Sequence, residues 1–541
     1  MRNLLIPVVG VSLVGMSMLA GAANAQYVYV EIPLLPGTVQ GGAYGVNDAG
    51  DVVGWCRASD NMHYGFLYES DTGNVINLGA LGTSAAGLLI GPRAINDDRE
   101  VVGVWGCACA GGARAFYWNP NLGFMDISYQ PRPGDVVFAG AFGINRDGQV
   151  AGVNVLLCPN VNFAVQAAAL WTDPTDPQTP PVPVFPSPFA CGIGGFGLGI
   201  NNIGAVCGWV QVSEGGFSWT RATVAGVQLP TFSPAQGGHS TAFAINNGGV
   251  ACGYSEDRSG SGPASSACYW LPGGQINRLN GIPAGTIFGQ ALALNDEGDV
   301  VGWTGPSTGS RAVIWPGLSD TPIDLNTLLI NSPGTGRILF TAEDISNTGF
   351  VVGRLSQGLN ARAYLLVPCD LLEIGSPRDA VSCASGPATF SVSISGSASF
   401  QWQVNTGTPE SPMWCDLVDG VVGGACAGGS SLAMFSGALT SSLSITSMGL
   451  ADQREYRCVA STGCGLRTSE PALLTVCLPD VNCDLETDIL DFLDFLDAFG
   501  VCNGQPSPCA SSNGISPDFN GDTIVDILDF LDFIDAFGRG C

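Results

Sequence analysis

The chain has 541 residues and a net charge of −27 at pH 7, with 46% apolar and 12% charged residues. It contains no lysine, which excludes chemistry that needs a lysine amine, and its acidity argues against nucleic acid as a partner because phosphate binding needs a basic surface. The length predicts two to four domains, and the 76 glycines favour compact, turn-rich β structure over helices or disorder.

The first 25 residues have the pattern of a secretory signal. Arg2 precedes an apolar run over 4–20, and Ala23-Asn24-Ala25 supplies a small-x-small cleavage site. The alternative is an uncleaved anchor helix, but the run contains glycine and is short for a membrane span. We expect a mature chain that begins at Gln26, has no transmembrane span, and is secreted, extracellular or held at the cell surface.

Export would allow the 19 cysteines to form disulfides. Because the number is odd, at least one cysteine is expected to be free, intermolecular or modified.

Seven copies of one phrase fill the region 26–368. Each follows the pattern of "GVNDAGDVVGW", which begins at Gly45: an apolar run, Asn or Ser, two variable residues, usually Gly, and a β-branched run. Successive copies are 49, 49, 56, 45, 49 and 51 residues apart, and a period near fifty indicates a repeat architecture. The Asn or Ser positions are Asn47, Asn96, Asn145, Asn201, Asn246, Asn295 and Ser346.

Each repeat predicts four strands. The Asn side chain can cap its own backbone and Gly accepts positive φ, so the phrase predicts a tight hairpin. An apolar strand that usually ends in an aromatic residue follows, and then a short strand such as "VINLG" (75–79). Four strands per repeat are typical of a propeller blade.

The two ends of this region predict closure. The seventh repeat lacks a fourth strand, and "YVYVEIP" (27–33) can supply one, which would remove an exposed edge. We therefore predict a seven-bladed β-propeller over 26–368, with an open β-solenoid as the alternative.

The repeat resembles the bacterial extracellular HAF repeat, whose units carry an I-N-x-x-G-x-V-x-G phrase and an A-F-x-W phrase, as in "AFYW" (115–118). The resemblance implies little about activity, because the family is largely of unknown function. We expect the propeller to be a binding or interaction scaffold for a glycan or protein ligand.

Catalytic motifs are scarce. The only histidines are His63 and His239, which disfavours a histidine-based metal site or triad, and G-x-S-x-G, H-E-x-x-H and Gly-rich phosphate motifs are absent. We assign no catalytic residue and no organic cofactor. Acidic pairs such as Asp97 and Asp98 leave open a glycosidase or lyase on the propeller.

A set of tryptophans recurs at what we take to be one position of the repeat. A periodic aromatic residue favours core packing over a sugar-binding platform. The residues are Trp118, Trp171, Trp219, Trp270 and Trp315.

The region 369–477 changes to short alternating strands. "FQWQ" places Trp402 as the core tryptophan, and "ADQREYRCV" places Asp452, Tyr456 and Cys458 in a tyrosine-corner arrangement. The region resembles a bacterial Ig-like β-sandwich, which implies a spacer or a binding module.

This sandwich departs from the Ig pattern at its cysteines. Phe390 occupies the region of the first intersheet cysteine, so Cys458 is not expected to form the usual bridge. Cys383 with Cys464 is a candidate substitute, although seven cysteines in this region leave the pairing open.

The region 478–541 states one acidic phrase twice, as "DVNCDLETDILD" (480–491) and "DFNGDTIVDILD" (518–529). Both place oxygen side chains at positions 1, 3, 5, 9 and 12, which is the ligand spacing of a calcium loop that opens onto a helix. We predict two calcium ions. The first set of ligands is Asp480, Asn482, Asp484, Asp488, Asp491 and the carbonyl of Glu486; the second is Asp518, Asn520, Asp522, Asp526, Asp529 and the carbonyl of Ile524.

Two features qualify this metal prediction. Leu485 and Thr523 stand where such a loop usually has Gly, so both turns are expected to be strained and the affinity reduced. The alternative is an acidic helical hairpin without metal.

A helix is predicted after each loop. Phe492, Phe495, Leu496 and Phe499 share one face, as do the equivalent residues of the second copy, so the two faces should pack together. Acids are expected to point outward at Asp494, Asp497, Asp532 and Asp535. Disulfides among Cys483, Cys502, Cys509 and Cys541 could stabilise so small a domain.

This duplicated unit resembles a dockerin, and the ending "GRGC" resembles the GC-type dockerin domain-anchored proteins. The resemblance implies calcium-dependent docking to a cohesin-like module or to a cell-surface component. In dockerins, loop positions 10 and 11 help to select the partner; here they are Ile489 and Leu490, then Ile527 and Leu528. These pairs are identical in the two copies, so either copy could present the same face.

The sequence thus predicts a signal (1–25), a propeller (26–368), an Ig-like sandwich (369–477) and a small α-helical dockerin-like module (478–541). We expect an exported, non-catalytic protein attached by its calcium-dependent tail. The alternative is a carbohydrate-active enzyme delivered by that tail.

Overall fold

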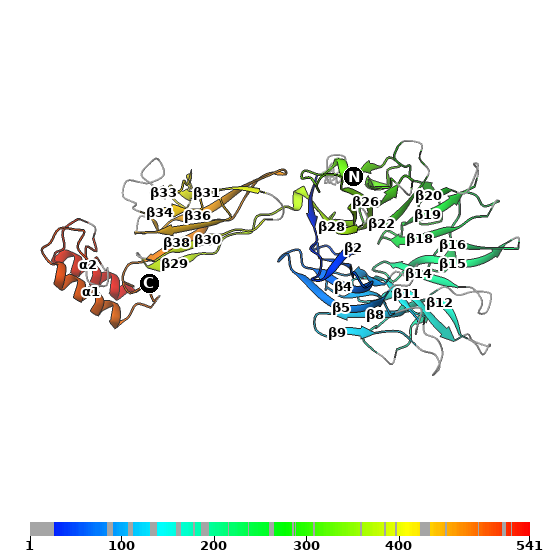
Figure 1. Ribbon diagram of the computed structural model, residues 1–541, viewed down its shortest axis with the longest axis horizontal. Coiled ribbons are helices and arrows are strands. Elements are labelled where there is room, and N and C mark those ends of the chain that lie inside the picture. The colour runs from blue at the N-terminus through cyan, green and yellow to red at the C-terminus, as the bar shows by residue number, and fades with distance from the viewer. Residues whose placement is uncertain are drawn as a thin grey trace, which may run out of the picture. The chain divides into compact units, whose positions relative to one another are not determined.

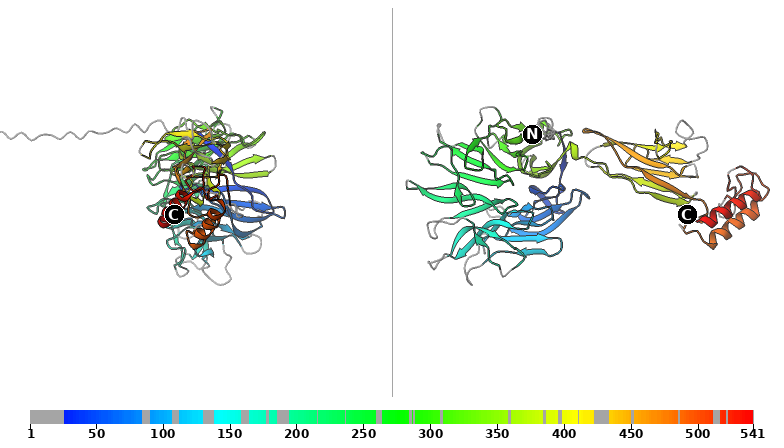
Figure 2. Two further views of the ribbon diagram at one scale, coloured as in Figure 1. Left: turned by 90° about the vertical axis from the view of Figure 1, so that its left-hand side faces the viewer. Right: turned by 180° about the vertical axis from the view of Figure 1, so that it is seen from behind.

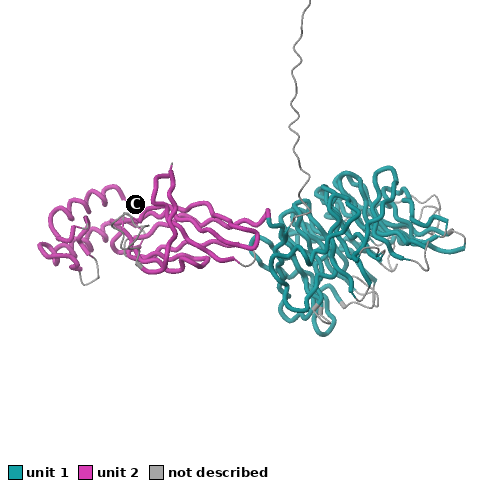
Figure 3. Tube along the Cα trace, turned by 90° about the horizontal axis from the view of Figure 1, so that it is seen from above, with its two compact units in different colours: residues 1–369 teal, residues 370–541 magenta. Residues whose placement is uncertain are grey.

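A computed structural model of the chain describes residues 26–540, apart from the segments 84–89, 107–111, 130–137, 158–163, 177–178, 185–193, 215, 236, 259–263, 284–285, 287, 307–308, 358–359, 384–385, 395–397, 410, 422–432, 450–451, 485, 511–515 and 521. The predicted signal lies outside the described residues. The chain divides into two compact units, residues 1–369 and 370–541 (Figure 3).

The described part of unit 1 consists of seven four-stranded antiparallel sheets (Figure 1). Sheets one to three are β2 (Thr38–Val46), β3 (Val52–Ala58), β4 (Met62–Tyr68) and β5 (Val75–Thr83); β6 (Gly91–Ile95), β7 (Val101–Trp105), β8 (Arg114–Asn119) and β9 (Gly123–Asp126); and β10 (Gly140–Ile144), β11 (Val150–Leu157), β12 (Ala164–Trp171) and β13 (Val182–Pro183). Sheets four and five are β14 (Gly195–Ile200), β15 (Val206–Glu214), β16 (Phe217–Val224) and β17 (Val227–Gln228); and β18 (Ser240–Ile245), β19 (Ala251–Asp257), β20 (Ala264–Trp270) and β21 (Ile276–Arg278). Sheets six and seven are β22 (Gly289–Leu294), β23 (Val300–Thr304), β24 (Arg311–Trp315) and β25 (Ile323–Asp324); and β26 (Ile338–Ile345), β27 (Val351–Gln357), β28 (Asn360–Pro368) and β1 (Tyr27–Glu31).

The repeated phrase forms the turn between the first two strands of each sheet. In sheet one, Asn47 Oδ1 accepts a hydrogen bond from the Asp51 N–H at 2.8 Å, and the Gly50 N–H donates to the Asn47 carbonyl. Gly50 has a φ of 84°, which explains why this position is usually Gly. Side-chain capping therefore fixes each turn locally, as the sequence predicts.

The first strand of every sheet carries a bulge three residues before the Asn or Ser. One residue there has no partner on the second strand, which increases the local twist. The bulged residues are Tyr44, Arg93, Phe142, Leu198, Phe243, Leu292 and Glu343.

First strands of successive sheets contact one another, from β2 with β6 onwards to β22 with β26, and β26 in turn contacts β2. Figure 1 and the right-hand view of Figure 2 show the seven sheets grouped about one centre. The seventh sheet contains both ends of the region, because β1 pairs with β28 in the register Tyr27↔Pro368 to Glu31↔Tyr364. This is the pairing that the sequence predicts for the N-terminal segment.

The recurrent tryptophans are core residues in three sheets. Trp171, Trp270 and Trp315 are at most 3% exposed. The indole N–H of Trp171 donates to the Ile127 carbonyl, and those of Trp270 and Trp315 donate to the Pro230 and Asn280 carbonyls. They pack one sheet against the next, and the prediction of core packing is confirmed for them.

The assignment of Trp219 to the same position is wrong. Val101 faces Trp118 in sheet two, whereas the equivalent Val206 of sheet four receives a hydrogen bond from Ala225. Trp219 lies further from the turn, opposite Val212. The strand β16 is longer than the phrase "GFSW" suggests, and this length displaced the alignment.

Unit 2 begins with two facing sheets. One has the order β29 (Ala380–Cys383), β38 (Ala472–Cys477), β36 (Glu455–Thr462), β31 (Ala398–Asn405) and β32 (Trp414–Asp416), with β37 (Gly465–Thr468) paired to β36; the other has the order β30 (Ala388–Ser391), β35 (Ser442–Thr446), β34 (Met434–Ser436) and β33 (Gly420–Val421). Both sheets contribute to one core, which includes Phe390, Trp402, Leu443 and Tyr456. The Tyr456 hydroxyl donates to the Asp452 carbonyl at 3.1 Å, the contact expected of a tyrosine corner.

The chain then forms two helices, α1 (Ile489–Cys502) and α2 (Ile527–Arg539), which lie side by side (Figure 2). Their predicted apolar faces meet: the rings of Phe495 and Phe533 stack at 3.9 Å, and both side chains are fully buried. The structure also has short 3₁₀ turns at η2 (Pro316–Leu318), η3 (Leu325–Thr327) and η4 (Cys369–Leu371). The prediction of a mainly β chain with two C-terminal helices is confirmed. None of the helices in the described ranges has the length and apolar character required to cross a membrane.

Candidate metal centre

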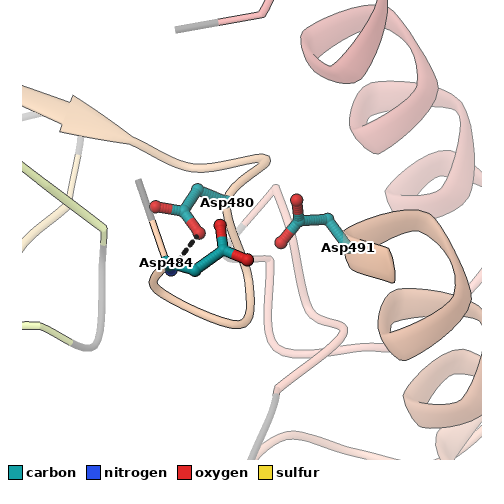
Figure 4. Close-up of side chains that lie close together, drawn as sticks. All are labelled: Asp480, Asp484 and Asp491. Atoms are coloured by element: carbon teal, nitrogen blue, oxygen red, sulfur yellow. Dashed lines mark hydrogen bonds between the residues drawn. The ribbon is translucent and has the colours of Figure 1, made fainter. Parts of the chain in front are cut away.

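Three carboxylates of the first acidic loop converge. Asp480, Asp484 and Asp491 each place an oxygen within 4.8 Å of the others. Figure 4 shows Asp491, at the start of α1, with its carboxylate directed towards the two loop residues. Asp480 and Asp491 are at most 1% exposed, whereas Asp484 is exposed. The cluster therefore has a buried base and one open side.

The start of α1 positions this cluster. Asp488 is the N-cap, and its Oδ1 accepts from the Leu490 N–H at 2.7 Å. Asp491 stands three residues later and accepts from the N–H groups of Asp488, Val481 and Asn482 at 2.9, 2.9 and 3.1 Å. This capping box holds the helix and the loop to one carboxylate.

The side chains within the loop turn the backbone around the same point. Asn482 Oδ1 accepts from the Asp484 N–H at 3.0 Å, and Asp484 Oδ1 accepts from the Glu486 N–H at 2.9 Å. Each is a short-range side-chain to backbone bond of the kind that tightens loops. Alternate residues are thereby brought to the inside, as the predicted ligand spacing requires.

The second loop repeats most of this network. Asp529 is fully buried and accepts from the N–H groups of Asn520 and Asp526 at 3.0 and 2.9 Å. Asn520 Oδ1 accepts from Asp522, and Asp522 Oδ1 accepts from Ile524. Within the described residues, the acids of this loop do not form a triad as close as that of the first loop.

A buried oxygen in the second loop has no hydrogen-bond partner. Asp518 Oδ1, at loop position 1, is inaccessible to solvent and unpaired. A buried carboxylate oxygen without a partner is costly unless a cation satisfies it. In the described part of the chain, Asp491 and Asp529 also form no ion pair with an arginine. These features fit a cation at each loop, and a donor set made only of oxygens suits a hard ion such as calcium.

The structure places each predicted metal residue. Asp480, Asp484 and Asp491 come together, and Asp518 and Asp529 occupy the equivalent places in the second loop. Asp488 and Asp526 cap the helices. Glu486 and Ile524, predicted as carbonyl ligands, enter the network through their N–H groups. Thr523 adopts a φ of 75°, so the strain expected where Gly is missing is present; Leu485 lies outside the described residues.

The predicted partner residues lie on the outside of the helices. Ile489 and Leu490 are 62% and 52% exposed, and Ile527 and Leu528 are 59% and 51% exposed. Sequence reasoning missed Leu493 and Leu531, which are also more than half exposed. Their spacing of three and four residues from the predicted pairs places them on the same helix face, so the signal was present in the repeated phrase.

The disulfides differ from the sequence prediction. Cys383 bonds Cys483, not Cys464, and the predicted pairing within the C-terminal module holds only for Cys502 with Cys509. The physical reason is the register of β29, which places Cys383 opposite Cys477, next to the start of the first loop. Cys464 follows the far end of β36 and forms another disulfide. Cys541 lies outside the described residues.

Cys458 is a free, buried thiol, as the departure from the Ig cysteine pattern predicts. The ring of Phe390 stacks on Tyr456 at 5.2 Å in the region where a bridging cysteine would stand.

Neither protein-family models nor curated proteins gave a match to this chain.

Proposed function

We propose that the protein is an exported, non-catalytic, surface- or matrix-attached protein that docks through a calcium-dependent dockerin-like tail. In this proposal unit 1 is a seven-bladed β-propeller of HAF-type repeats, residues 369–477 are an Ig-like spacer, and residues 478–541 bind two calcium ions and a cohesin-like module or cell-surface component. The single observation that carries the docking role is the duplicated, exposed apolar face beside each acidic loop.

The propeller interpretation is supported by seven four-stranded sheets. Their first strands contact one another in sequence order, and the first strand of sheet seven contacts that of sheet one. The Ig-like reading is supported by two facing sheets, the buried Trp402 and the Tyr456 to Asp452 contact. In both units the supporting residues are those that the sequence patterns single out.

The docking face consists of Ile489, Leu490 and Leu493 on α1 and the equivalent Ile527, Leu528 and Leu531 on α2. Contiguous exposed apolar side chains are typical of interaction sites. Because each set begins directly after the capping aspartate of its loop, a cation that orders the loop would also fix the first turn of the helix. Calcium would thus prepare the face for its partner.

The test is a pull-down with the full mature chain from the envelope and medium of the source organism, in millimolar calcium and in chelator. Retained proteins are purified, and their binding to the wild type is compared with their binding to a Leu490→Asp/Leu528→Asp variant and to a control, Asp60→Asn, which changes an exposed residue of unit 1. We expect calcium-dependent binding that the double variant loses and the control keeps. Retention that is the same in chelator, or unchanged by the double variant, contradicts docking through this face.

A second candidate is a glycosidase on unit 1, and one observation favours it. Burial raises the pKa of Asp344 to about 7, with the carboxylates of Asp48 and Glu343 adding to the shift. A carboxyl group that stays protonated near neutral pH can act as a general acid beside an ionised carboxylate. Hydrolysis of a panel of polysaccharides that is lost in Asp344→Asn would support this candidate; a panel without turnover would exclude it.

A further inference from the structure

A cavity of about 430 Å³ lies in unit 1 where the first turns of all seven sheets meet. Its size is within the range of about 300–1,000 Å³ typical of small-molecule sites. Every sheet contributes the apolar residue that ends its first strand and the residue after the Asn or Ser, and all but sheet six also contribute the Asn or Ser itself. The lining is mostly polar, so a suitable ligand would be hydrophilic.

The asparagines of the repeated phrase form one layer of the cavity lining, and their side-chain amides bond to other parts of the protein. Asn47 Nδ2 donates to the Asn96 carbonyl of the next sheet at 3.2 Å, and Asn96, Asn145, Asn201 and Asn246 each do the same to their successor at 3.0 to 3.1 Å. This layer holds the sheets together. Recognition of a ligand would therefore fall to the residues on either side of it.

The next layer, at the mouth, is formed by the residue after each Asn or Ser. The backbone N–H of one member donates to the side-chain oxygen of the next, as Asn202 does to Asn247 at 2.8 Å and Asn347 does to Asp48 at 2.7 Å. One side-chain oxygen of each acceptor is thus used along the ring. The second carboxylate oxygen is also used in two places, because Asn247 Nδ2 donates to Asp296 Oδ2 at 2.7 Å and Asn347 Nδ2 donates to Asp48 Oδ2 at 3.4 Å. Asp and Asn are interchangeable in these backbone bonds.

The charges of the cavity are unevenly distributed. Asp296, Asp344, Asp48 and Asp97 belong to sheets six, seven, one and two, which are consecutive around the circle of contacts. Sheets three, four and five contribute Arg146, Asn202 and Asn247 instead. One side of the cavity is therefore acidic, and the opposite side carries a cation and amide groups.

Asp344, two residues before Ser346, is the only acidic residue at its position among the seven sheets. It aligns with small residues in the other six sheets: Gly45, Ala94, Gly143, Gly199, Ala244 and Ala293. Small residues are needed there because neighbouring first strands approach closely; a Cβ on Gly143 would lie 3.1 Å from the Leu198 carbonyl oxygen. Asp344 accepts from the Val46 N–H of sheet one at 3.0 Å and from Ile345. Its carboxyl group nevertheless lines the cavity, where it adds an acidic group that no other sheet has at this position.

From this geometry we propose that the cavity binds a small polar molecule that carries an ammonium group and hydrogen-bonding oxygens, of the size of one amino sugar. The ammonium group would lie against the acidic side, and the oxygens would face Arg146 and the amides of Asn202 and Asn247. This inference deepens the scaffold part of the proposed function, and it does not depend on the calcium-dependent tail.

A bare metal ion is a poorer match. Within the described residues, no three carboxylates of the cavity approach one another as closely as those of the first loop in unit 2. A dehydrated calcium ion needs six to eight oxygens at about 2.3–2.6 Å. Carboxylates distributed over four sheets suit a larger cation better.

The test is calorimetric titration of the full mature chain with glucosamine and with N-acetylglucosamine, in which acetylation removes the charge. Chelator is present throughout, so that failure of the tail cannot affect the result. We expect glucosamine to bind with a Kd of about 1 mM or tighter, and at least tenfold more tightly than its acetylated counterpart.

Two variants locate the site. Asp48→Asn/Asp296→Asn removes two charges and places at both positions the residue that sheets four, five and seven already have, so that folding is preserved. Asp344→Ala copies the Ala of sheets two, five and six. We expect each variant to bind glucosamine at least fivefold more weakly than the wild type. The exposed control Asp60→Asn should bind it with unchanged affinity.

Three results overturn the proposal: no binding of glucosamine, equal binding of the two sugars, or equal binding by the wild type and the charge-removing double variant. A separate titration without chelator in which calcium displaces glucosamine would also overturn it, in favour of a metal site.

Discussion

Asn47 donates its side-chain amide to the main-chain carbonyl of Asn96, 49 residues later, while its side-chain oxygen caps its own turn. One buried residue thus specifies a turn and joins two sheets. Four further asparagines repeat both bonds or their equivalents. The pattern that makes the repeat visible in sequence is therefore the pattern that holds successive repeats together.

Replacing one of these residues should cost stability at two places. Asn201→Ala removes the acceptor of the Ala205 N–H and one of the two donors to the Asn246 carbonyl, which keeps the Gly249 N–H. Loss of partners by buried polar groups costs about 1–3 kcal/mol. We expect the free energy of unfolding of unit 1, measured with urea, to fall by that amount in Asn201→Ala. Asn202→Ala, at the exposed mouth of the cavity, should lower it less. Equal shifts would contradict a special role for the buried layer.

The stability of unit 1 should fall as pH rises through the range set by Asp344. Burial raises the pKa of this carboxyl to about 7 from an ordinary value near 3.8, and Asp48 and Glu343 are the acids that act on it, the latter paired with Arg354. A raised folded-state pKa means that the stabilising contribution is complete below about pH 4 and is lost by about pH 7. Melting temperatures measured across this range should decline for the wild type and decline less for Asp344→Ala. A variant with the same pH profile as the wild type would exclude this assignment.

Calcium should stabilise the C-terminal helices. A cation that binds only the folded loops stabilises them by about 2.7 kcal/mol at a hundredfold excess over its Kd. We expect chelator to lower helix content on heating, and Asp491→Ala to remove most of the response by opening the buried base of the first loop. Asp497→Ala, on the outer side of α1, is the matched control. A response that Asp491→Ala retains in full would assign calcium binding to the second loop alone.

Five cysteines should be unreactive in the native protein. Cys56, Cys207, Cys252, Cys268 and Cys458 are free and buried, and burial raises the pKa of Cys207 to about 12 and that of Cys458 to about 11. Because the thiolate is the reactive form, alkylation should be slow until the chain unfolds. Mass spectrometry after brief iodoacetamide treatment, with and without urea, checks this. Rapid labelling of any of the five in the native state would reveal local opening there.

The features that the sequence predicted correctly are those determined by contacts between residues close in sequence. The turn around Asn47, the N-terminal strand and the apolar faces of the two helices depend on residues close in sequence or on simple periodicity. They appear where predicted, although the strand predicted over 27–33 ends at Glu31. The Trp219 error arose because strand length, which sets the register in sheet four, has no signal in the phrase itself. The Cys383 to Cys483 bond depends on which strands are neighbours, and this information is absent from cysteine spacing.

In the acidic loops and the exposed helix face, too, the predictable features were those set by local spacing. The oxygen spacing identified both acidic loops, and the helix period contained Leu493 and Leu531. The acidic side of the cavity could not be foreseen, because Asp48, Asp97, Asp296 and Asp344 belong to four repeats and become neighbours only when the sheets are placed in order.

The seventh sheet is built from two segments that lie far apart in the sequence. Its outer strand comes from residues 27–31 and its other three from residues 338–368, and the Cys369 N–H donates to the Gln26 carbonyl. The two ends of the described part of unit 1 are therefore adjacent, and the sheets themselves do not require the polypeptide to begin and end at this point. A circular permutant joined at this point and opened between two other sheets should keep every strand pairing, and the N-terminal strand could complete whichever repeat comes last.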